Sequence, residues 1–509
     1  MKNKTIYKIL SIMMIVTLII VSINISSYAV QSTDTTSLVI EGLEAGVSVT
    51  AYRLATINVD DTTGQLMDPE YEWEESVLAW LQTESNGYTD YEDPADFAEV
   101  TDAETLETFY SAIAAAIKGE TLTISTSYTG EADGDDATYP VETTHTATID
   151  GVEMGLYLVI IENGYMIYTP SAVLVVAEWD GSSYSLAESF SVNVKLTTPT
   201  ITESVTDTST QVDNYSTTST INYTITANVP NYAENSIYKT YTITDELSGG
   251  LTLDTSTDIV VSAVSGDETI TLVAGTDYTI TTTETGFTVQ FVYSSIDGYD
   301  EVQITFSASL SQDSSTVVGS SGNINTATLT YSNNPYTDST QETTSSSTVY
   351  TYGIEITKLN KSDEALEGAT FNLKDSSGNV LTFIQSGGVY YLSTDSSASA
   401  DLVSDSSGLI TIYGLDEGTY TLQETVAPDD YILDTTPEEI VISDASLDGT
   451  LDENDEDGDG VYELTWYNST GFSLPITGGT GTVIFSVVGV CLIIIGVVLK
   501  RKSNKEENK

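Results

Sequence analysis

Short segments in which apolar and polar residues alternate recur through most of this chain. Four of them, rich in Thr, Val, Ile, Tyr and Phe, span residues 221–227, 241–245, 287–291 and 302–306. The side chains of a β-strand point alternately to its two faces, so these segments predict strands with one buried face. Many short strands separated by turn residues are typical of sandwiches. The pattern therefore predicts a mostly all-β chain of tandem immunoglobulin-like β-sandwich domains.

The 509 residues leave room for about three domains. We expect a signal peptide at 1–29, domains at 30–198, 199–348 and 349–472, and a sorting signal at 474–509. The first domain has a small helical insert, because residues 73–81 and 103–118 have helical spacing among strands such as 37–40, 47–54, 157–160 and 172–176. The Ser- and Thr-rich stretch 339–348 is predicted to be a polar linker.

The N-terminus has the parts of a secretory signal peptide. Lys2, Lys4 and Lys8 precede an apolar stretch at 9–21, and Ser27 and Ala29 provide the small residues of a cleavage site. We therefore expect cleavage after Ala29. The alternative is a retained membrane anchor, which the shortness of the apolar stretch disfavours.

A second signal near the C-terminus consists of a pentapeptide, an apolar run at 482–499 and the basic residues 500–502. The pentapeptide is Leu474, Pro475, Ile476, Thr477 and Gly478. The three parts in this order resemble the sortase cell-wall sorting signal, whereas a chance pentapeptide would not explain the order. The resemblance implies that the run holds the precursor in the plasma membrane as a transmembrane segment. A sortase cysteine then attacks the Thr477 carbonyl, Gly478 leaves, and an amine resolves the thioester.

Composition narrows the function further. The chain has 76 acidic and 15 basic residues, and its net charge of -61 excludes the basic surface that nucleic-acid binding needs. The one cysteine, Cys491, lies in the apolar run, so a covalent cross-link in the exported part must use chemistry other than a disulfide. We find no Ser–His–Asp set, phosphate-binding loop or Cys pair in the exported sequence. We therefore expect a protein that is not an enzyme and uses no cofactor.

Three polar residues extend the apolar rows of predicted strands. Lys358 alternates with Ile354 and Ile356, and Glu424 and Asn468 alternate with apolar residues in the same way. Burial lowers the pKa of an amine and raises the pKa of a carboxyl group. A neutral Lys358 could then attack the side-chain carbonyl of Asn468, with Glu424 relaying protons and ammonia leaving. The alternative is that the three are solvated residues near strand ends.

Stretches 356–358, 366–371 and 420–428, together with Asn468, resemble a CnaB-type domain. The resemblance covers the whole third domain. It implies an intramolecular isopeptide bond between Lys358 and Asn468, promoted by Glu424 in a single turnover. Asp430 stands where the family usually has Gly, at a turn position.

Residues 199–336 resemble the CnaA-like second domain of sortase-assembled major pilins, on the stretches 199–201, 223–230, 241–245 and 325–327. The resemblance makes Asp245 the acid and places Asn325 in the Asn-bearing strand. Glu203 stands where the family usually has the nucleophilic Lys. Lys239 is near Asp245 in the sequence, but it is not at the family position. Isopeptide formation in this domain is therefore left open.

Residues 31–198 resemble the first domain of the same pilins, so the resemblance covers nearly all of the exported chain in the order of a SpaH/EbpB-type backbone pilin. Such pilins polymerise through a Lys in a Tyr-Pro-Lys motif at the junction of the first two domains. The motif is absent here, and Thr197 aligns with its Lys. Lys195 lies two residues earlier, on the same face of a strand. It is the predicted polymerisation lysine, and an ordinary solvated linker lysine is the alternative.

The resemblance implies a structural function: the subunit of a covalently polymerised pilus (fimbrium) on the cell wall. Its partners would be pilin-type and housekeeping sortases, identical and accessory pilin subunits, peptidoglycan and host surface ligands. The alternative is a monomeric wall-anchored adhesin with isopeptide-stabilised stalk domains.

The acidic stretch 452–460 contains the closely spaced carboxylates that Ca²⁺ prefers. The EF-hand spacing fails, because the twelfth position counted from Glu453 is Leu464. We expect a solvated hairpin loop and no metal site.

Overall fold

The computed structural model describes residues 29–134, 142–206, 208–233 and 235–470, with positions 488–490, 492–495 and 497. Most of the predicted signal peptide, the pentapeptide 474–478 and most of the apolar run lie outside the described residues. No helix among the described residues is long and apolar enough to cross a membrane. The chain divides into two compact units: Met1–Asp213, Ser219–Ser311 and Asn323–Val349 form one, and Asn214–Thr218, Gln312–Gly322 and Tyr350–Lys509 form the other.

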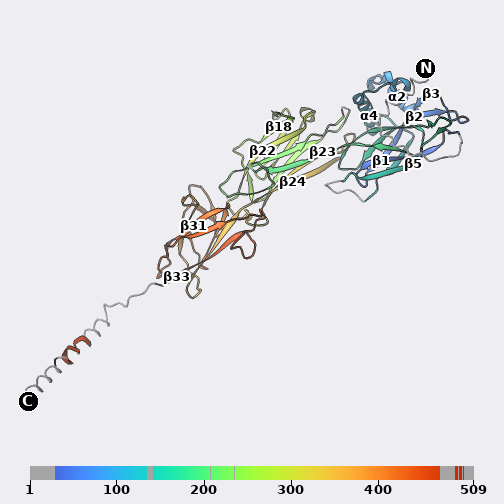
Figure 1. The fold of residues 1–509 in the computed structure, drawn as a ribbon. Helices are drawn as coiled ribbons and strands as arrows, with labels where there is room; N and C mark the ends of the chain where they lie inside the picture. The colour runs from blue at the N-terminus through green and yellow to red at the C-terminus, as the bar shows by residue number, and fades with distance from the viewer. Residues whose placement is uncertain are drawn as a thin grey trace, which may run out of the picture. The chain divides into compact units, whose positions relative to one another are not determined.

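We call residues 29–198 the first region, 199–349 the middle region and 350–470 the last region. The first region contains a sheet of order β11-β1-β5 and a sheet of order β3-β2-β6-β8 in which β4 also pairs with β2 (Figure 1). Two small two-stranded sheets, β10-β9 and β12-β7, complete it. The strands are β1 (Thr35–Leu43), β2 (Ser48–Val59), β3 (Leu66–Trp73), β4 (Ser127–Glu131), β5 (His145–Glu153), β6 (Gly155–Glu162), β7 (Ile167–Thr169), β8 (Ser171–Val175), β9 (Glu178–Trp179), β10 (Tyr184–Ser185), β11 (Ser189–Asn193) and β12 (Lys195–Thr197).

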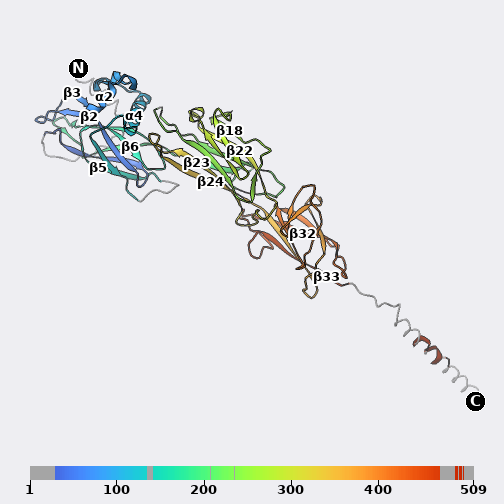
Figure 2. The same cartoon turned by 180° about the vertical axis from the view of Figure 1, so that it is seen from behind.

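The predicted helical insert is present in this region. Helix α4 begins where the side chain of Asp102 accepts a hydrogen bond from the Thr105 backbone N–H, at 2.9 Å. Its buried face, which includes Phe109, packs on the sheet of β2, β6 and β8 (Figures 1 and 2). Trp73, which we expected to start a helix, ends strand β3 instead. The helical elements are α2 (Glu75–Leu81), η2 (Glu84–Asn86), η3 (Thr89–Tyr91), α3 (Pro94–Phe97) and α4 (Ala103–Lys118).

The middle region is a sandwich of two sheets. Their strand orders are β13-β15-β22-β18-β19, with β17 also paired to β22, and β14-β24-β23-β16-β21-β20. The four alternating segments predicted from the sequence form β15, β16, β21 and β22. The elements are β13 (Ile201–Val205), β14 (Val212–Asn214), β15 (Ile221–Asn228), β16 (Tyr241–Leu247), β17 (Leu251–Leu253), β18 (Val260–Ser265), β19 (Glu268–Thr271), β20 (Tyr278–Thr283), β21 (Gly286–Phe291), η4 (Tyr293–Ser295), β22 (Glu301–Leu310), β23 (Asn323–Ser332) and β24 (Thr340–Tyr350).

The prediction of a polar linker at 339–348 was wrong. These residues form most of β24, which pairs antiparallel with β23 along its whole length. Thr343, Ser347 and Val349 are buried from this strand. Thr is β-branched and is favoured in strands, and the buried Ser347 hydroxyl donates a hydrogen bond inside the sandwich. The polar composition of the stretch therefore led to a linker prediction for residues that form a strand.

The last region is a second sandwich, with sheets of order β27-β28-β30-β25-β33 and β29-β26-β31-β32. Its first and last strands, β25 and β33, lie side by side and parallel. The core between the sheets contains Phe371, Leu422 and Trp466 among other residues. The strands are β25 (Tyr352–Asn360), β26 (Thr370–Lys374), β27 (Phe383–Ser386), β28 (Val389–Leu392), β29 (Leu402–Val403), β30 (Leu409–Leu415), β31 (Gly418–Val426), β32 (Glu438–Ile442) and β33 (Val461–Asn468).

Candidate functional site

The core of the last region encloses the side chains of Lys358, Glu424 and Asn468. Lys358 comes from β25 and Asn468 from β33, which are neighbours in one sheet, and Glu424 comes from β31 of the opposite sheet. Their relative exposures are 0%, 1% and 1%. Lys358 pairs with Trp466 in the parallel register, so Asn468 lies one side-chain repeat further along the same face of β33. All three polar groups therefore face the interior and are not solvated.

The backbone near Lys358 is held by a close turn. Lys358 donates its backbone N–H to Gly408 O at 2.7 Å, and its carbonyl accepts from Leu366 N at 2.9 Å. Gly408 has φ +77°, and a Cβ at this position would lie 2.5 Å from Lys358 O. A residue with a side chain could not take this place without moving β25. The glycine thus helps to position the buried amine.

The contacts of these side chains connect all three strands. Asn468 Nδ2 donates to Glu424 Oε2 at 3.0 Å and to Ile432 O at 2.7 Å. Lys358 Nζ lies 3.4 Å from Trp466 O. Within the described residues, Glu424 Oε1 and Asn468 Oδ1 have no hydrogen-bond partner. Buried polar atoms without partners cost free energy, so the two unpaired oxygens destabilise this arrangement as it stands.

Burial also changes the charge state of the amine. It lowers the pKa of Lys358 to about 8, while the carboxylates of Glu424 and Asp434 act in the opposite direction. A much larger share of the amine is then unprotonated near neutral pH than for an exposed lysine. A neutral buried amine beside a carboxamide and a carboxyl group has the components that amide transfer needs.

The middle region encloses a related group made of Glu203, Asp245 and Asn325, with exposures of 0%, 1% and 0%. Asn325 Nδ2 donates to Glu203 Oε1 at 2.5 Å and to Asp245 Oδ2 at 2.9 Å. Ser347 Oγ also donates to Glu203 Oε1, at 2.7 Å. Burial raises the pKa of Glu203 to about 7, and burial and the charge of Glu203 raise the pKa of Asp245 well above its ordinary value. The structure therefore brings both predicted second-domain residues together with Glu203.

Lys239 does not join this group. Its Nζ lies over the ring of Tyr293, 5.4 Å from the ring centroid. Gly286 helps to place the acid instead: a Cβ there would lie 2.0 Å from the backbone oxygen of Asp245. The strands β21 and β16 can approach each other only because this position has no side chain.

Lys195 lies at the start of β12, which pairs with β7. Its side chain is 57% exposed, and Nζ is 3.2 Å from Glu107 Oε2 of helix α4. Thr197, two residues on, belongs to the same short strand. The predicted polymerisation lysine thus has an accessible amine held by one exposed ion pair, which costs little to break.

Parts of the chain match three known sequence families. Residues 217–335 match the Gram-positive pilin backbone subunit 2, Cna-B-like domain. Residues 352–457 match a prealbumin-like fold domain, and residues 467–509 match the LPXTG cell wall anchor motif. The chain carries the domains of a Gram-positive backbone pilin. These modules are structural, and together with the anchor motif they indicate an extracellular pilus protein attached to the cell wall.

Individual proteins agree with these matches. The trypsin-resistant surface T6 protein of Streptococcus pyogenes serotype M6 is 25% identical over 329 residues, and the match spans 58% of this chain and 57% of the relative. The solved T6 backbone pilin of that organism shares the fold, with a TM-score of 0.58, 19% identity and coverage of 87% of this chain and 100% of the other. The full-length major pilin SpaD of Corynebacterium diphtheriae has a TM-score of 0.50 and 18% identity, over 87% and 99% of the two chains.

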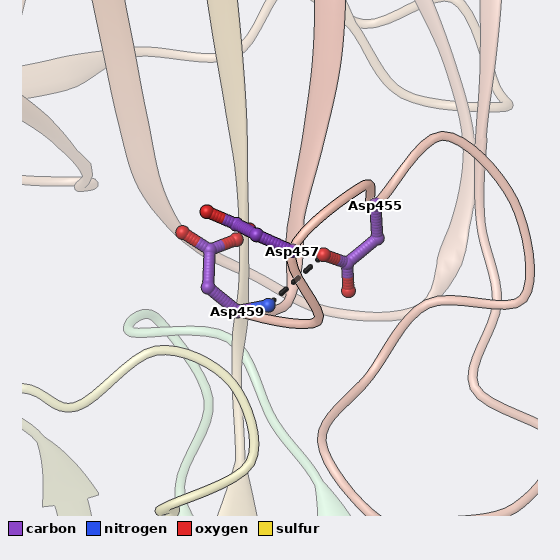
Figure 3. A group of neighbouring side chains, drawn as sticks. All are labelled: Asp455, Asp457 and Asp459. Atoms are coloured by element: carbon purple, nitrogen blue, oxygen red, sulfur yellow. Dashed lines mark hydrogen bonds between the residues drawn. The ribbon is translucent and has the colours of Figure 1, made fainter.

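The acidic loop of the last region brings Asp455, Asp457 and Asp459 together, with ligand atoms within 4.8 Å of one another (Figure 3). The carboxylate of Asp455 accepts from four backbone N–H groups of the loop, including that of Asp459 at 2.9 Å. Asp457 and Asp459 are exposed. The loop's own hydrogen bonds account for the cluster, and the absence of a metal site stays a prediction.

Sequence reasoning missed one residue of the buried polar group in the middle region. Ser347, which donates to Glu203, lies in the stretch that we predicted to be a linker. A possible signal was the run of β-branched and hydroxyl residues at 343–349, which ends in Val349 and can form a strand.

Proposed function

We propose that this chain is the repeating backbone subunit of a covalent pilus of the SpaH/EbpB type, joined head to tail by a pilin-type sortase. The sortase thiolate attacks the Thr477 carbonyl, and the Thr477–Gly478 bond breaks as Gly478 leaves as an amine. The Lys195 amine of the next subunit then attacks the thioester. An amide between Thr477 and Lys195 Nζ forms, and the thiol is released.

The observation that carries this proposal is the accessibility of Lys195. Among the lysines in the described residues, Lys195 and Lys361 are exposed, whereas Lys118, Lys239, Lys358 and Lys374 are partly or fully buried. Lys361 lies over the ring of Tyr467 in the last region, 4.8 Å from the ring centroid. Lys195 also lies at the end of the first region, beside the position where the resemblance expects the acceptor amine.

The test is an electrophoretic comparison of wall extracts under denaturing conditions. We expect a ladder of high-mass species from the wild-type chain and from Lys361→Arg, and none from Lys195→Arg. Arginine keeps the positive charge beside Glu107 but cannot act as the acceptor amine. A ladder from Lys195→Arg would place the acceptor elsewhere. A single wall-linked species from the wild-type chain would favour the monomeric adhesin.

We further propose that Lys358 and Asn468 form an isopeptide bond in the last region. The Lys358 Nζ attacks Asn468 Cγ, the Cγ–Nδ2 bond breaks, and ammonia leaves. Glu424 accepts a proton from the amine and supplies one to the departing nitrogen, which its Oε2 already contacts at 3.0 Å. Negative charge develops on Asn468 Oδ1 during the attack. The burial of all three groups and the lowered pKa of Lys358 support this chemistry.

Export and anchoring follow the two terminal signals in this proposal. Signal cleavage after Ala29 releases the N-terminus, and the apolar run 482–499 holds the precursor in the plasma membrane until the sortase cuts. The last subunit would pass to peptidoglycan through a housekeeping sortase.

A further inference from the structure

The middle and last regions each contain a buried group that consists of one carboxyl side chain, one Asn side chain and a third polar side chain from the first strand of the sandwich. In the last region the third group is the amine of Lys358, and in the middle region it is the carboxyl of Glu203 on β13. Asp245 and Asn325 lie on the neighbouring strands β16 and β23, and Glu203 reaches them from the opposite sheet. The middle region therefore has an acid and an amide in contact, with no amine beside them.

The geometry around Asn325 is specific. Its Nδ2 is held between Glu203 Oε1 at 2.5 Å and Asp245 Oδ2 at 2.9 Å. Within the described residues, Asn325 Oδ1, Glu203 Oε2 and Asp245 Oδ1 have no hydrogen-bond partner. The nitrogen that would leave in an amide transfer is thus already next to an acid. The tip of residue 203 is within hydrogen-bonding distance of the same amide.

The surroundings do not neutralise two carboxylates. In the part of the chain that the structure describes, no Lys, Arg or His forms an ion pair with Glu203 or Asp245. The further titratable group whose charge acts on Asp245 is Glu246, the next residue on β16. It would be neutral or negative, so it does not offset the charge. Two buried carboxylates that share one amide cannot both ionise at low cost.

We propose that Glu203, Asp245 and Asn325 form an amide-transfer site in which a carboxyl group stands where the nucleophilic amine would be. The strands of the middle region are therefore linked by hydrogen bonds among these three side chains and not by a covalent bond. The two carboxyl groups together retain at least one proton at neutral pH. The raised pKa values of both carboxyls agree with the retained proton. In the natural chain Asn325 keeps its amide, and the link between β13 and β23 is reversible.

An amine at position 203 completes the site. Its nitrogen bonds to Asn325 Cγ, the Cγ–Nδ2 bond breaks, and Nδ2 leaves as ammonia. Asp245 supplies a proton to the leaving nitrogen and accepts one from the attacking amine, so it returns to its starting state. The product has lost one ammonia, about 17 Da.

The first experiment is peptide mapping by mass spectrometry of the full chain after peptic digestion. In the Glu203→Lys chain we expect a cross-linked peptide that joins position 203 to Asn325 with the loss of ammonia. We expect no such peptide in Glu203→Gln or in the double variant Glu203→Lys/Asp245→Ala. A folded Glu203→Lys chain with Asn325 unlinked would overturn the proposal. A wild-type map that joins Asn325 to Lys239 or another lysine would also overturn it, whether or not any variant folds.

The second experiment tests the proton in the full chain without relying on Glu203→Lys. Hydrogen exchange of the β23 amides, corrected for the intrinsic rate, should show an opening constant that rises at least about tenfold per pH unit between pH 5 and 7, because opening releases one retained proton or more. Neutral isosteres in the double variant Glu203→Gln/Asp245→Asn should remove this dependence. An equal pH dependence in the wild-type chain and the double variant would refute the retained proton.

Discussion

Replacing Glu424 by Gln tests the proposed cross-link of the last region with almost no change of shape. The amide of Gln can still contact Asn468, but it cannot exchange protons with the Lys358 amine. The variant should therefore fold without forming the bond. Glu367→Gln is the matched control, because Glu367 is an exposed carboxyl of the same region.

The magnitude follows from the length of chain that the bond closes. Lys358 and Asn468 lie at the start and end of the last region, so the bond would close a loop of roughly 110 residues. The chain-entropy argument for cross-links then gives about 5 kcal/mol of stabilisation, acting through the unfolded state. For a region of this size the loss should lower the unfolding temperature by roughly 15–25 °C.

Two measurements on the exported chain, residues 30–473, check this. The intact mass of the wild-type chain and of Glu367→Gln should be about 17 Da below the mass calculated from each sequence, and that of Glu424→Gln should equal it. Calorimetry should show the transition of the last region moving down in Glu424→Gln alone. A wild-type chain at its full calculated mass, or a Glu424→Gln chain that still lacks ammonia, would refute the reasoning.

Three further outcomes follow from the buried charges. Unlinked Glu424→Gln should become more stable as pH rises towards 10.5, the ordinary pKa of a lysine. Its buried Lys358 loses its proton at a lower pH than the unfolded chain does, and removing the charge of Glu424 lowers the Lys358 pKa further. Chemical denaturation at two pH values would show the sign. Ser347→Ala should destabilise the middle region by about 1–2 kcal/mol, because it removes a hydrogen-bond donor to Glu203. Faster hydrogen exchange of the β13 amides would show this, and the exposed control Ser346→Ala should have no effect. Arg53→Met should cost about 3 kcal/mol in thermal unfolding, since it leaves Glu74 and Glu153 without their shared partner, whereas Glu72→Gln nearby should be close to neutral.

Local periodicity predicted much of the fold. Helix 103–118 was correct in both bounds, and the alternation at 221–227 and 302–306 identified central strands of the middle sandwich. The alternation of side chains between the two faces of a strand also placed Lys358 on the buried face of β25. Each of these properties belongs to one segment of chain, and the apolar residues that record it are close together in the sequence.

Stretch 339–348 marks the limit of that approach. Nothing in its Ser and Thr side chains distinguishes a linker from a strand, and residues 340–348 form a strand because β23 pairs with each of them. Tyr336 is a second example: it follows β23 of the middle region, yet it packs in the helical core of the first region and its hydroxyl contacts Ser111 at 2.9 Å. Partners far apart in the chain decide both cases.

The sequence by itself determined the β-rich architecture, the C-terminal anchor motif and the faces on which Lys358, Glu424 and Asn468 lie, because the alternation of residues along a strand and a short motif are local properties. Only the tertiary structure decided that the Asn325 amide lies between Glu203 and Asp245, that Ser347 donates to Glu203 and that Lys239 lies elsewhere. Those relations depend on the register of β13, β16, β23 and β24 and on the packing of one sheet on the other, which bring side chains 80 to 144 residues apart to within 3 Å.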